Sequence, residues 1–462
     1  MKKRDIFDNI SPIDYRYWDK DVAYYLSENG FTRYKLKVEI ALAKILHKRR
    51  MCDATAVQEI KLACKKVTTK DVYNEEGRIK HDIRALVNCI RNKVSKAVKR
   101  IVHMIATSFD ISDTANAARY KDVTKKILLP ELIKLEKVLI ELTKNEAETK
   151  QIGRTHGQHA IPITFGFAMA EYVSRLGGCI LSIDKQTSNL VGKFSGAVGG
   201  YNASSLFFDD PEVFEQEVLA ELGLKPADHS TQIVQPEPLT RLLCEVVITS
   251  SVLANLSDDM RNLQRTEIGE VGEAFEEGQV GSSTMPQKRN PINFENAKGF
   301  WKIVMPRLTT VFMDQISEHQ RDLTGSGSAR TYGEIFAYVV SKTKRLTRTM
   351  KKLQVDKNNL QRNLALQQDL IIAEPLYIIL AAMGHPNAHE KVRLLTLEAQ
   401  QKHKPLEEIA MADKEIAPYF EKMTHRQREI ISNPSSYTGI SAEKAKKIAA
   451  EWTEKLKQFE YT

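Results

Sequence analysis

Apolar residues recur at helical spacing in two stretches of the chain. The leucines of the first stretch step by four and three residues, at Leu128, Leu132, Leu135, Leu139 and Leu142. The second stretch, from about residue 237 to residue 271, carries the apolar positions Val246, Leu253, Leu256, Met260 and Leu263. Because this spacing places side chains on one helix face, each stretch predicts a long helix with a buried stripe. Two such helices predict a helical bundle, and we assign the stripes to its core.

Glycine and proline are sparse, with 22 and 15 residues in a chain of 462. Long intervals contain neither residue and so lack the turns that strands and hairpins need. The sequence therefore predicts an all-α fold. The length predicts two or three structural units. Shifts in composition place the boundaries near residues 97 and 356, giving helical domains over residues 1–97, 98–356 and 357–462, with the long-helix bundle in the middle one.

Composition excludes several classes of protein. Hydrophobic residues make up 42% and charged residues 27%, which is ordinary for a globular protein and unlike a disordered one. The longest apolar run, from Leu376 to Met383, is too short to span a bilayer. The five cysteines are scattered without metal-ligand or disulfide spacing, so a reducing cytoplasm is expected. The net charge of +9 favours encounters with anions, but the basic residues are dispersed, as on solvated helix faces, rather than gathered for nucleic acid.

Four polar segments are candidates for chemistry. In TSFDISDT, residues 107–114, Thr107 or Ser108 followed three residues later by an acid or hydroxyl resembles a capping box. The alternative is that these hydroxyls and the free amides of the helix start bind a carboxylate or phosphate. In IKHDIRAL, residues 79–86, His81 and Asp82 stand beside Lys80 and Arg84. The segment is either a solvated helix face or one in which Lys80, His81 and Arg84 bind phosphate oxygens.

The segment GRTHGQHAIP, residues 153–162, contains His156 and His159 in a polar loop with glycine. A zinc site needs three or four ligands, and no cysteine, third histidine or acid stands nearby in sequence. A general acid or base is favoured over metal, because histidine exchanges protons near neutral pH.

The segment GSSTMPQKRNP, residues 281–291, predicts a mobile cationic loop suited to closing over an anionic substrate. Asn290 and Pro291 at its end predict a helix entry, with Asn290 as the N-cap and Pro291 as the first helical residue.

Three of these four segments, TSFDISDT, GRTHGQHA and GSSTMPQKRNP, occur in an order and at distances that resemble the fumarase/aspartase superfamily of lyases. Within it, the chain resembles the adenylosuccinate lyase family through SPIDYRYWDK at residues 11–20, KHD at 80–82, TQ at 231–232, MPQKRNPINFENAKG at 285–299 and QRDLTGSGSAR at 320–330. The resemblance covers the chain from about residue 11 to beyond residue 390. It implies the elimination of fumarate from adenylosuccinate and from the related succinylamino-carboxamide ribotide, without metal or organic cofactor.

The resemblance also implies roles for individual residues. By matching position, Ser282 is the base that removes the Cβ proton, His156 is the general acid, and Lys288 and Asn290 bind the succinyl carboxylates. Thr107 and Ser108 match ligands of the succinyl part. The remaining substrate contacts are Arg16, Tyr17, Lys80, His81, Asp82, Gln232, Met285, Arg321, Ser326 and Arg330.

The family fold is all-α, and its members are homotetramers in which each site draws on three subunits. The resemblance thus implies a small anionic purine-nucleotide substrate, a homotetramer with shared sites, and no nucleic-acid or membrane partner. Two positions depart from the commoner pattern: His159 replaces proline, and the glycine-rich GSGSAR run leaves open whether Ser326 or Ser328 contacts phosphate. Two alternatives are kept. One is argininosuccinate cleavage, because Gln287 is also found in that family, and the other is a non-catalytic helical scaffold that binds nucleic acid.

Overall fold

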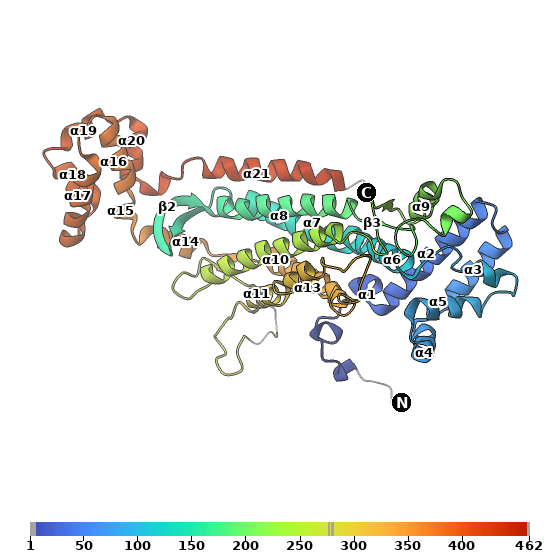
Figure 1. The fold of residues 1–462 in the computed structure, drawn as a ribbon. Helices are drawn as coiled ribbons and strands as arrows, with labels where there is room; N and C mark the ends of the chain where they lie inside the picture. Colours follow the sequence, from blue (N-terminus) through green and yellow to red (C-terminus); the bar gives the residue numbers. More distant parts are fainter. Residues whose placement is uncertain (1–5, 276–277, 279–280, 460–462) are drawn as a thin grey trace. The chain divides into compact units, whose positions relative to one another are not determined.

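The structure is a computed structural model that describes residues 6–275, 278 and 281–459. Helices dominate it (Figure 1). The helices before residue 150 are α1 (Lys20–Leu26), α2 (Glu28–Lys48), α3 (Ala54–Lys66), α4 (Thr69–Ile79), α5 (Asp82–Arg91), α6 (Ser108–Val123) and α7 (Leu129–Asn145). Those that follow up to residue 351 are α8 (Phe165–Ser188), α9 (Pro211–Ala220), α10 (Glu237–Leu263), α11 (Ile292–Val304), α12 (Arg307–Met313) and α13 (Tyr332–Lys351).

The last part of the chain consists of short helices and one longer helix. They are α14 (Lys357–Ala365), α15 (Gln368–Ile371), α16 (Ala373–Ala382), α17 (Ala388–Lys402), α18 (Leu406–Ala412), α19 (Ala417–Lys422), α20 (His425–Ser432) and α21 (Ser441–Leu456). In the described part of the chain, the strands form three two-stranded pairs: β1 (Lys150–Thr155) with β2 (Gln158–Thr164), β3 (Val191–Gly192) with β4 (Lys225–Pro226), and β5 (Val271–Gly272) with β6 (Gln354–Val355). The expected all-α class is confirmed, with these short strands as additions.

The chain divides into two compact units, and each is built from three separated segments. The first unit contains Met1–Ile133, Gly178–Ala254 and Asn296–Arg345, and the second contains Lys134–Gly177, Asn255–Glu295 and Leu346–Thr462. Five helices, α7, α8, α10, α11 and α13, continue from one unit into the other. The division into domains at residues 1–97, 98–356 and 357–462 stays a prediction.

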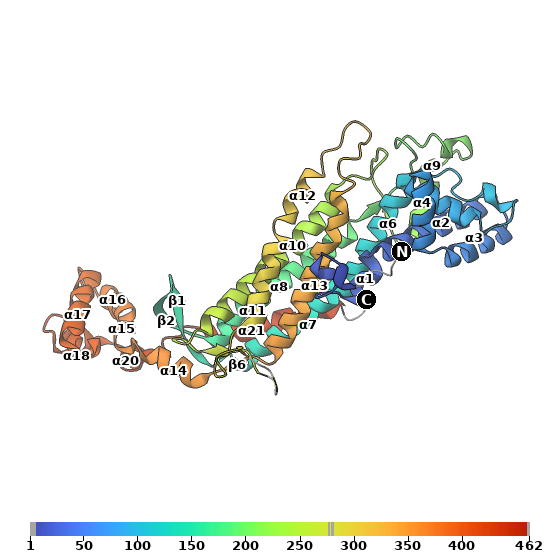
Figure 2. The same cartoon turned by 90° about the horizontal axis from the view of Figure 1, so that it is seen from below.

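The first unit has a core formed mainly by α2, α3, α5, α6 and α9, with Leu42, Ile60 and Leu86 almost fully buried in it. Its bundle helices α10, α11 and α13 run next to one another (Figure 2) and are also linked by polar contacts of their side chains. Lys342 on α13 donates hydrogen bonds to the carbonyl and hydroxyl oxygens of Ser250 on α10, at 2.9 and 2.8 Å. Trp301 on α11 donates to the hydroxyl of Ser251 at 2.9 Å. These contacts fix α11 and α13 against α10 within this unit.

The second unit has a separate core of short helices, in which Leu376, Leu380 and Leu406 of α16 and α18 are completely buried. The terminal helix α21 packs on α8, where the indole of Trp452 lies directly on Gly177. A side chain at position 177 would overlap the indole, so the contact requires glycine. Trp452 is 7% exposed.

Both predicted stripes are core. Leu128, Leu132 and Leu135 of the first are 0% exposed, and Leu139 is 1% exposed. The second stripe was expected to run to about residue 271, but α10 ends at Leu263. The amide of Glu270 turns back to the carbonyl oxygen of Leu263, at 2.9 Å, and β5 follows.

Among the described helices, α10 alone is long and apolar enough by itself to cross a membrane; α14 joined to the helical stretch Gln368–Ala382 passes the same test only as a pair bent by 60°. In α10, 61% of the most apolar window is buried inside the protein, as is usual for a core helix.

Candidate functional site

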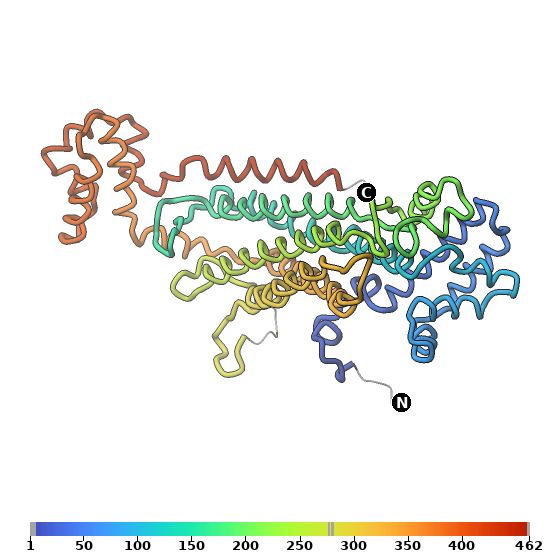
Figure 3. The backbone as a smooth tube through the Cα atoms, viewed as in Figure 1, coloured from blue at the N-terminus to red at the C-terminus, as the bar shows by residue number. Residues whose placement is uncertain are grey.

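The loop with Ser282 is irregular, as the sequence predicts (Figure 3). Most of its residues are exposed. The Ser282 hydroxyl oxygen accepts hydrogen bonds from the backbone amides of Thr284 and Met285, at 3.3 and 3.0 Å. Lys288 and Met285 are exposed in the same loop. Two amide donors on one oxygen create a local positive environment for negative charge there.

The helix entry after this loop differs from the expectation. Helix α11 begins at Ile292, so Asn290 is not its N-cap. The side-chain amide of Asn290 instead donates to the carbonyl oxygen of Gly281, at 3.0 Å, and closes the base of the loop. A buried carboxylate from outside the helix, that of Glu273, accepts from the amides of Asn293 and Phe294, at 2.9 and 3.0 Å. A cap supplied by a residue so far away in sequence leaves no local signal.

His156 lies at the tip of a β-hairpin, where the sequence predicts only a polar loop with glycine. Strands β1 and β2 pair Thr155 with Gln158, so His156 and Gly157 form the two-residue turn. Both have positive φ, 53° and 74°, which is the combination of a type I′ turn. The imidazole is exposed. A turn of this type usually carries Asn-Gly, so His-Gly at its centre is a weak sequence signal for a hairpin.

A buried carboxylate fixes the hairpin two residues before His156. Glu270 is 0% exposed and accepts two hydrogen bonds from the Arg154 guanidinium, at 2.5 and 3.1 Å. Gln151 and Asn363 donate to the same carboxylate, at 2.7 and 2.8 Å. Sequence reasoning missed Glu270, because the segment TEIGEVGE shows acids without showing which of them is buried.

His159 faces Arg154 across the hairpin. Burial lowers the pKa of His159, and the positive charge of Arg154 lowers it further, while Glu270 opposes the shift. The second histidine of the motif is therefore favoured in its neutral form.

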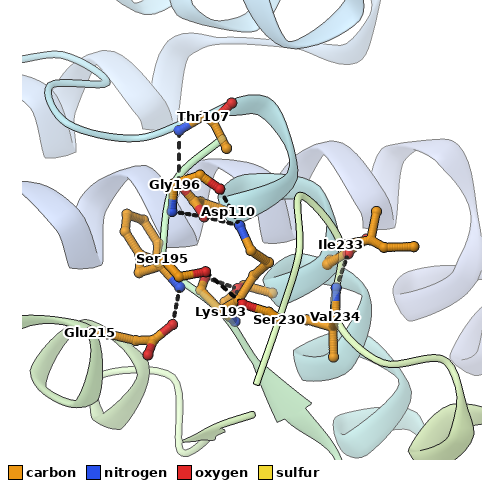
Figure 4. Close-up of polar contacts among 12 residues, drawn as sticks. Thr107, Asp110, Lys193, Ser195, Gly196, Glu215, Ser230, Ile233 and Val234 are labelled. Atoms are coloured by element: carbon orange, nitrogen blue, oxygen red, sulfur yellow. Dashed lines mark hydrogen bonds and ion pairs between the residues drawn. The ribbon is translucent and has the colours of Figure 1, made fainter. Parts of the chain in front are cut away.

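In the first unit, the capping box predicted at the start of α6 is confirmed. Thr107 is the N-cap, and its amide donates to the Asp110 carboxylate at 2.8 Å. Asp110 is fully buried and forms an ion pair with Lys193, and it also accepts from the amide of Gly196 at 3.2 Å (Figure 4). The α6 start, with Thr107 and Ser108, is thereby joined to the glycine-rich segment 192–205.

Gln232 lies in a tight turn beside this cluster. Ser230 and Val234 pair across the turn, and the Ser230 hydroxyl lies 2.6 Å from that of Ser195. The amide of Val234 donates to Asp113 on α6 at 2.9 Å. Burial raises the pKa of Asp113 to about 6. The structure thus brings Gln232, Thr107 and Ser108 together around α6.

The KHD motif is a turn between two helices rather than a helix face. Lys80 ends α4 in the left-handed conformation, with φ of 60°, and His81 is the N-cap of α5. The Nδ1 atom of His81 accepts from the amide of Arg84 at 3.3 Å. Nδ1 therefore carries no proton in this arrangement, and the neutral ring presents Nε2–H as a donor. Asp82 accepts from the buried Lys35 at 3.3 Å.

Arg321 approaches the start of α6, since its guanidinium lies 3.5 Å from the ring centre of Phe109. Burial lowers its pKa, and the charges of Asp113 and Asp82 oppose that shift. Ser328 donates to Asp314 at 2.6 Å, whereas Ser326 is exposed. The Ser328 hydroxyl is therefore occupied inside the protein.

The remaining expected contacts lie at other places in the first unit. Arg16 is exposed, and Tyr17 packs edge-on against Phe300, with ring centres 4.7 Å apart. Arg330 is 64% exposed at its side chain and lies 3.7 Å from Glu28. These three residues, Arg16, Tyr17 and Arg330, belong to the first compact unit. The catalytic candidates Ser282, His156 and Lys288 belong to the second. Within residues 6–275, 278 and 281–459, no group of three or more His, Cys, Asp or Glu side chains is placed to hold a metal ion.

Comparisons with known proteins cover nearly the whole chain. Residues 4–305 match the family model described as Lyase, and residues 317–433 match the model described as Adenylosuccinate lyase C-terminal. The adenylosuccinate lyase of Pyrococcus horikoshii is 36% identical over 458 residues, covering 97% of this chain and 99% of the relative. The adenylosuccinate lyase of Archaeoglobus fulgidus is 33% identical, covering 97% and 100%.

Solved structures show the same fold. The 3-carboxy-cis,cis-muconate lactonizing enzyme of Pseudomonas putida superposes with a TM-score of 0.84 at 24% identity, over 96% of this chain and 99% of that one. A fumarate lyase from Mesorhizobium gives a TM-score of 0.82 at 22% identity, over 94% and 98%.

Proposed function

The chain belongs to the adenylosuccinate lyase family of the fumarase/aspartase superfamily, and from this premise we propose that it eliminates fumarate from two substrates. Adenylosuccinate gives AMP, and the succinylamino-imidazole-carboxamide ribotide gives the corresponding carboxamide. Both reactions belong to purine nucleotide biosynthesis. In each, a Cβ proton is removed, the carbon–nitrogen bond breaks, and the departing nitrogen takes a proton.

Ser282 is the proposed base, and the observation that carries this role is the hydrogen bonding of its hydroxyl oxygen. A serine acts as a base only where its alkoxide is stabilised. The amides of Thr284 and Met285 both donate to this oxygen. They would stabilise the negative charge that remains on the oxygen when the hydroxyl loses its proton. Lys288 and Asn290 follow in the same loop and are the proposed ligands of the succinyl carboxylates, where charge develops in the transition state.

His156 is the proposed acid. The tight turn presents its imidazole at the end of a hairpin, and the hairpin is anchored through Arg154 to Glu270. The exposure of this imidazole in one chain supports a site that other subunits complete.

Apart from Met285, Lys288 and Asn290 of the Ser282 loop, which belong to the second unit, the substrate-binding residues are proposed to lie in the first unit. The hydroxyls of Thr107 and Ser108 and the start of α6 suit a succinyl carboxylate. The Nε2–H of His81, the guanidinium groups of Arg16, Arg321 and Arg330, and the hydroxyl of the exposed Ser326 suit the phosphate. The remaining contacts of the nucleotide and succinyl groups are assigned to Tyr17, Lys80, Asp82, Gln232 and Met285.

We further propose a cytoplasmic homotetramer with shared sites. Exposed apolar side chains lie on the long helices and at their ends, such as Ile248 on α10, 48% exposed, and Met305 just after α11, 43% exposed. Burying such positions against other copies of the chain stabilises an oligomer. None of the five cysteines, all of which lie in the described part of the chain, forms a disulfide bond, in agreement with a reducing compartment.

Ultraviolet absorbance tests the substrate assignment. Purified protein should consume adenylosuccinate and leave argininosuccinate unchanged, and the family matches already disfavour argininosuccinate. Turnover of argininosuccinate alone would refute the proposal. Salt-dependent retention of RNA without fumarate release would instead favour a non-catalytic scaffold.

A further inference from the structure

We propose that Glu270 is a positioning residue for the reaction, acting through the hairpin that carries His156. This inference rests on the proposed role of His156 as the acid. Glu270 itself lies beneath the hairpin and is fully buried, so it acts without contacting the substrate.

The contacts of Glu270 require a carboxylate. Four nitrogen–hydrogen donors converge on its two oxygens: two from Arg154, one from Gln151 and one from Asn363. Arg154 and Gln151 belong to β1, and Asn363 belongs to α14 and is 1% exposed. The carboxylate therefore joins the hairpin to a helix of the same unit. Glutamine has the same shape but only one acceptor oxygen, and its amide hydrogens would meet donors.

The hairpin transmits this anchoring directly to the acid. Only Thr155 separates Arg154 from His156. The pairing of β1 with β2 is irregular between Ile152 and Arg154, so strand pairing by itself holds this end of the hairpin less firmly. His156 also has positive φ, a conformation that persists only where the surrounding structure imposes it. Loss of the Glu270 anchor should move the imidazole more than it disturbs the core.

A second acid of the same segment serves the other catalytic element. Glu273 accepts from the first amides of α11, where the Ser282 loop ends. One short segment thus anchors the hairpin through Glu270 and the helix after the loop through Glu273.

The first test is steady-state kinetics of Glu270→Gln with adenylosuccinate. We expect kcat to fall about 100-fold, because a displacement of about 1 Å of a reacting group has that effect, while KM changes by less than about threefold. The control is Glu267→Gln, which makes the same charge change at an exposed position three residues earlier and should retain wild-type kcat. Wild-type kcat in Glu270→Gln would overturn the proposal.

The second test assigns the defect to one catalytic element by subunit mixing. If sites are shared, Glu270→Gln mixed with Ser282→Ala should regain activity, since roughly a quarter of sites in an equimolar hybrid then combine an intact hairpin with an intact loop. Glu270→Gln mixed with His156→Ala should stay silent, because every hairpin is damaged. Glu273→Gln should show the opposite pattern. Recovery of Glu270→Gln with His156→Ala but not with Ser282→Ala would refute the positioning role.

Two controls distinguish a failure of the shared-site proposal from a failure of the proposed role of Glu270. His156→Ala mixed with Ser282→Ala tests the shared site itself; silence there, with exchange verified by tagged subunits, counts against the shared-site proposal, and the kcat and KM values then decide the role of Glu270. If Glu270→Gln does not assemble, Arg154→Lys replaces it. Lysine keeps the charge but loses the paired guanidinium bonds, so kcat should fall about tenfold at unchanged KM. Wild-type kcat in Arg154→Lys would then overturn the inference.

Discussion

Glu136 on α7 should make the protein less stable as the pH rises. Its side chain is 0% exposed, and neither carboxyl oxygen has a hydrogen-bond partner among the described residues. Burial raises the pKa of Glu136 well above its ordinary value. The folded chain therefore retains a proton that the unfolded chain releases above a pH of about 4.3. Because the folded state binds more protons, the free energy of unfolding falls by about 1.4 kcal/mol for each pH unit from there up to the folded pKa.

Glu136→Gln removes this dependence, since glutamine has nearly the same volume and no charge. The free energy of unfolding of the variant should exceed that of the wild type by about 1.4 kcal/mol more for each pH unit. For a cooperative unit of 150–250 residues this corresponds to about 3–6 °C in Tm per pH unit. Thermal unfolding at pH 5, 6, 7 and 8, at one protein concentration, measures the gap. Glu141→Gln on the same helix is the control, because the side chain of Glu141 is 63% exposed. The difference in Tm between this variant and the wild type should stay the same at all four pH values. A gap between Glu136→Gln and wild type that stays constant over this range would refute the reasoning.

The remaining predictions concern the site. Ser282→Ala should bind substrate almost normally and lose several orders of magnitude in kcat, and near-normal turnover would move the role of base elsewhere. Activity should fall on both sides of an optimum near neutral or mildly alkaline pH and vanish in His156→Ala; loss of wild-type activity with a chelator and recovery with zinc would favour a metal role for that histidine. Arg330→Lys should raise KM for adenylosuccinate markedly, because a planar fork becomes a point donor, and an unchanged KM would make it a surface cation. Ser328→Ala should lower Tm by loss of the bond to Asp314, with KM unchanged, and a raised KM would make it the phosphate ligand.

The parts of the fold that sequence predicts are those whose signal is local. The leucines of α7 repeat every three or four residues, and such a repeat allows one helix face to be buried. The capping box at Thr107 and Asp110 is likewise local, because the two residues lie within one helical turn.

The parts that sequence reasoning missed depend on contacts between distant segments. Nothing near Asn293 shows that Glu273 caps its helix, and nothing near Arg154 shows that Glu270 lies beneath it. Motif matching placed the candidate residues of the site. It could not place the buried charges that hold their elements, because those charges show no period and no motif of their own.

The packing of Trp452 on Gly177 gives the protein an internal optical probe. Of the three tryptophans, Trp18 and Trp301 belong to the first unit, so Trp452 is the sole indole of the second. Trp18 is 60% exposed, whereas Trp452 is shielded between α21 and α8. Detachment of the terminal helix would transfer this one indole from an apolar contact to water and shift its fluorescence to longer wavelength. With Trp18 and Trp301 replaced by phenylalanine, the emission colour would report the docking of α21 in real time, at a position remote in sequence from Ser282 and His156.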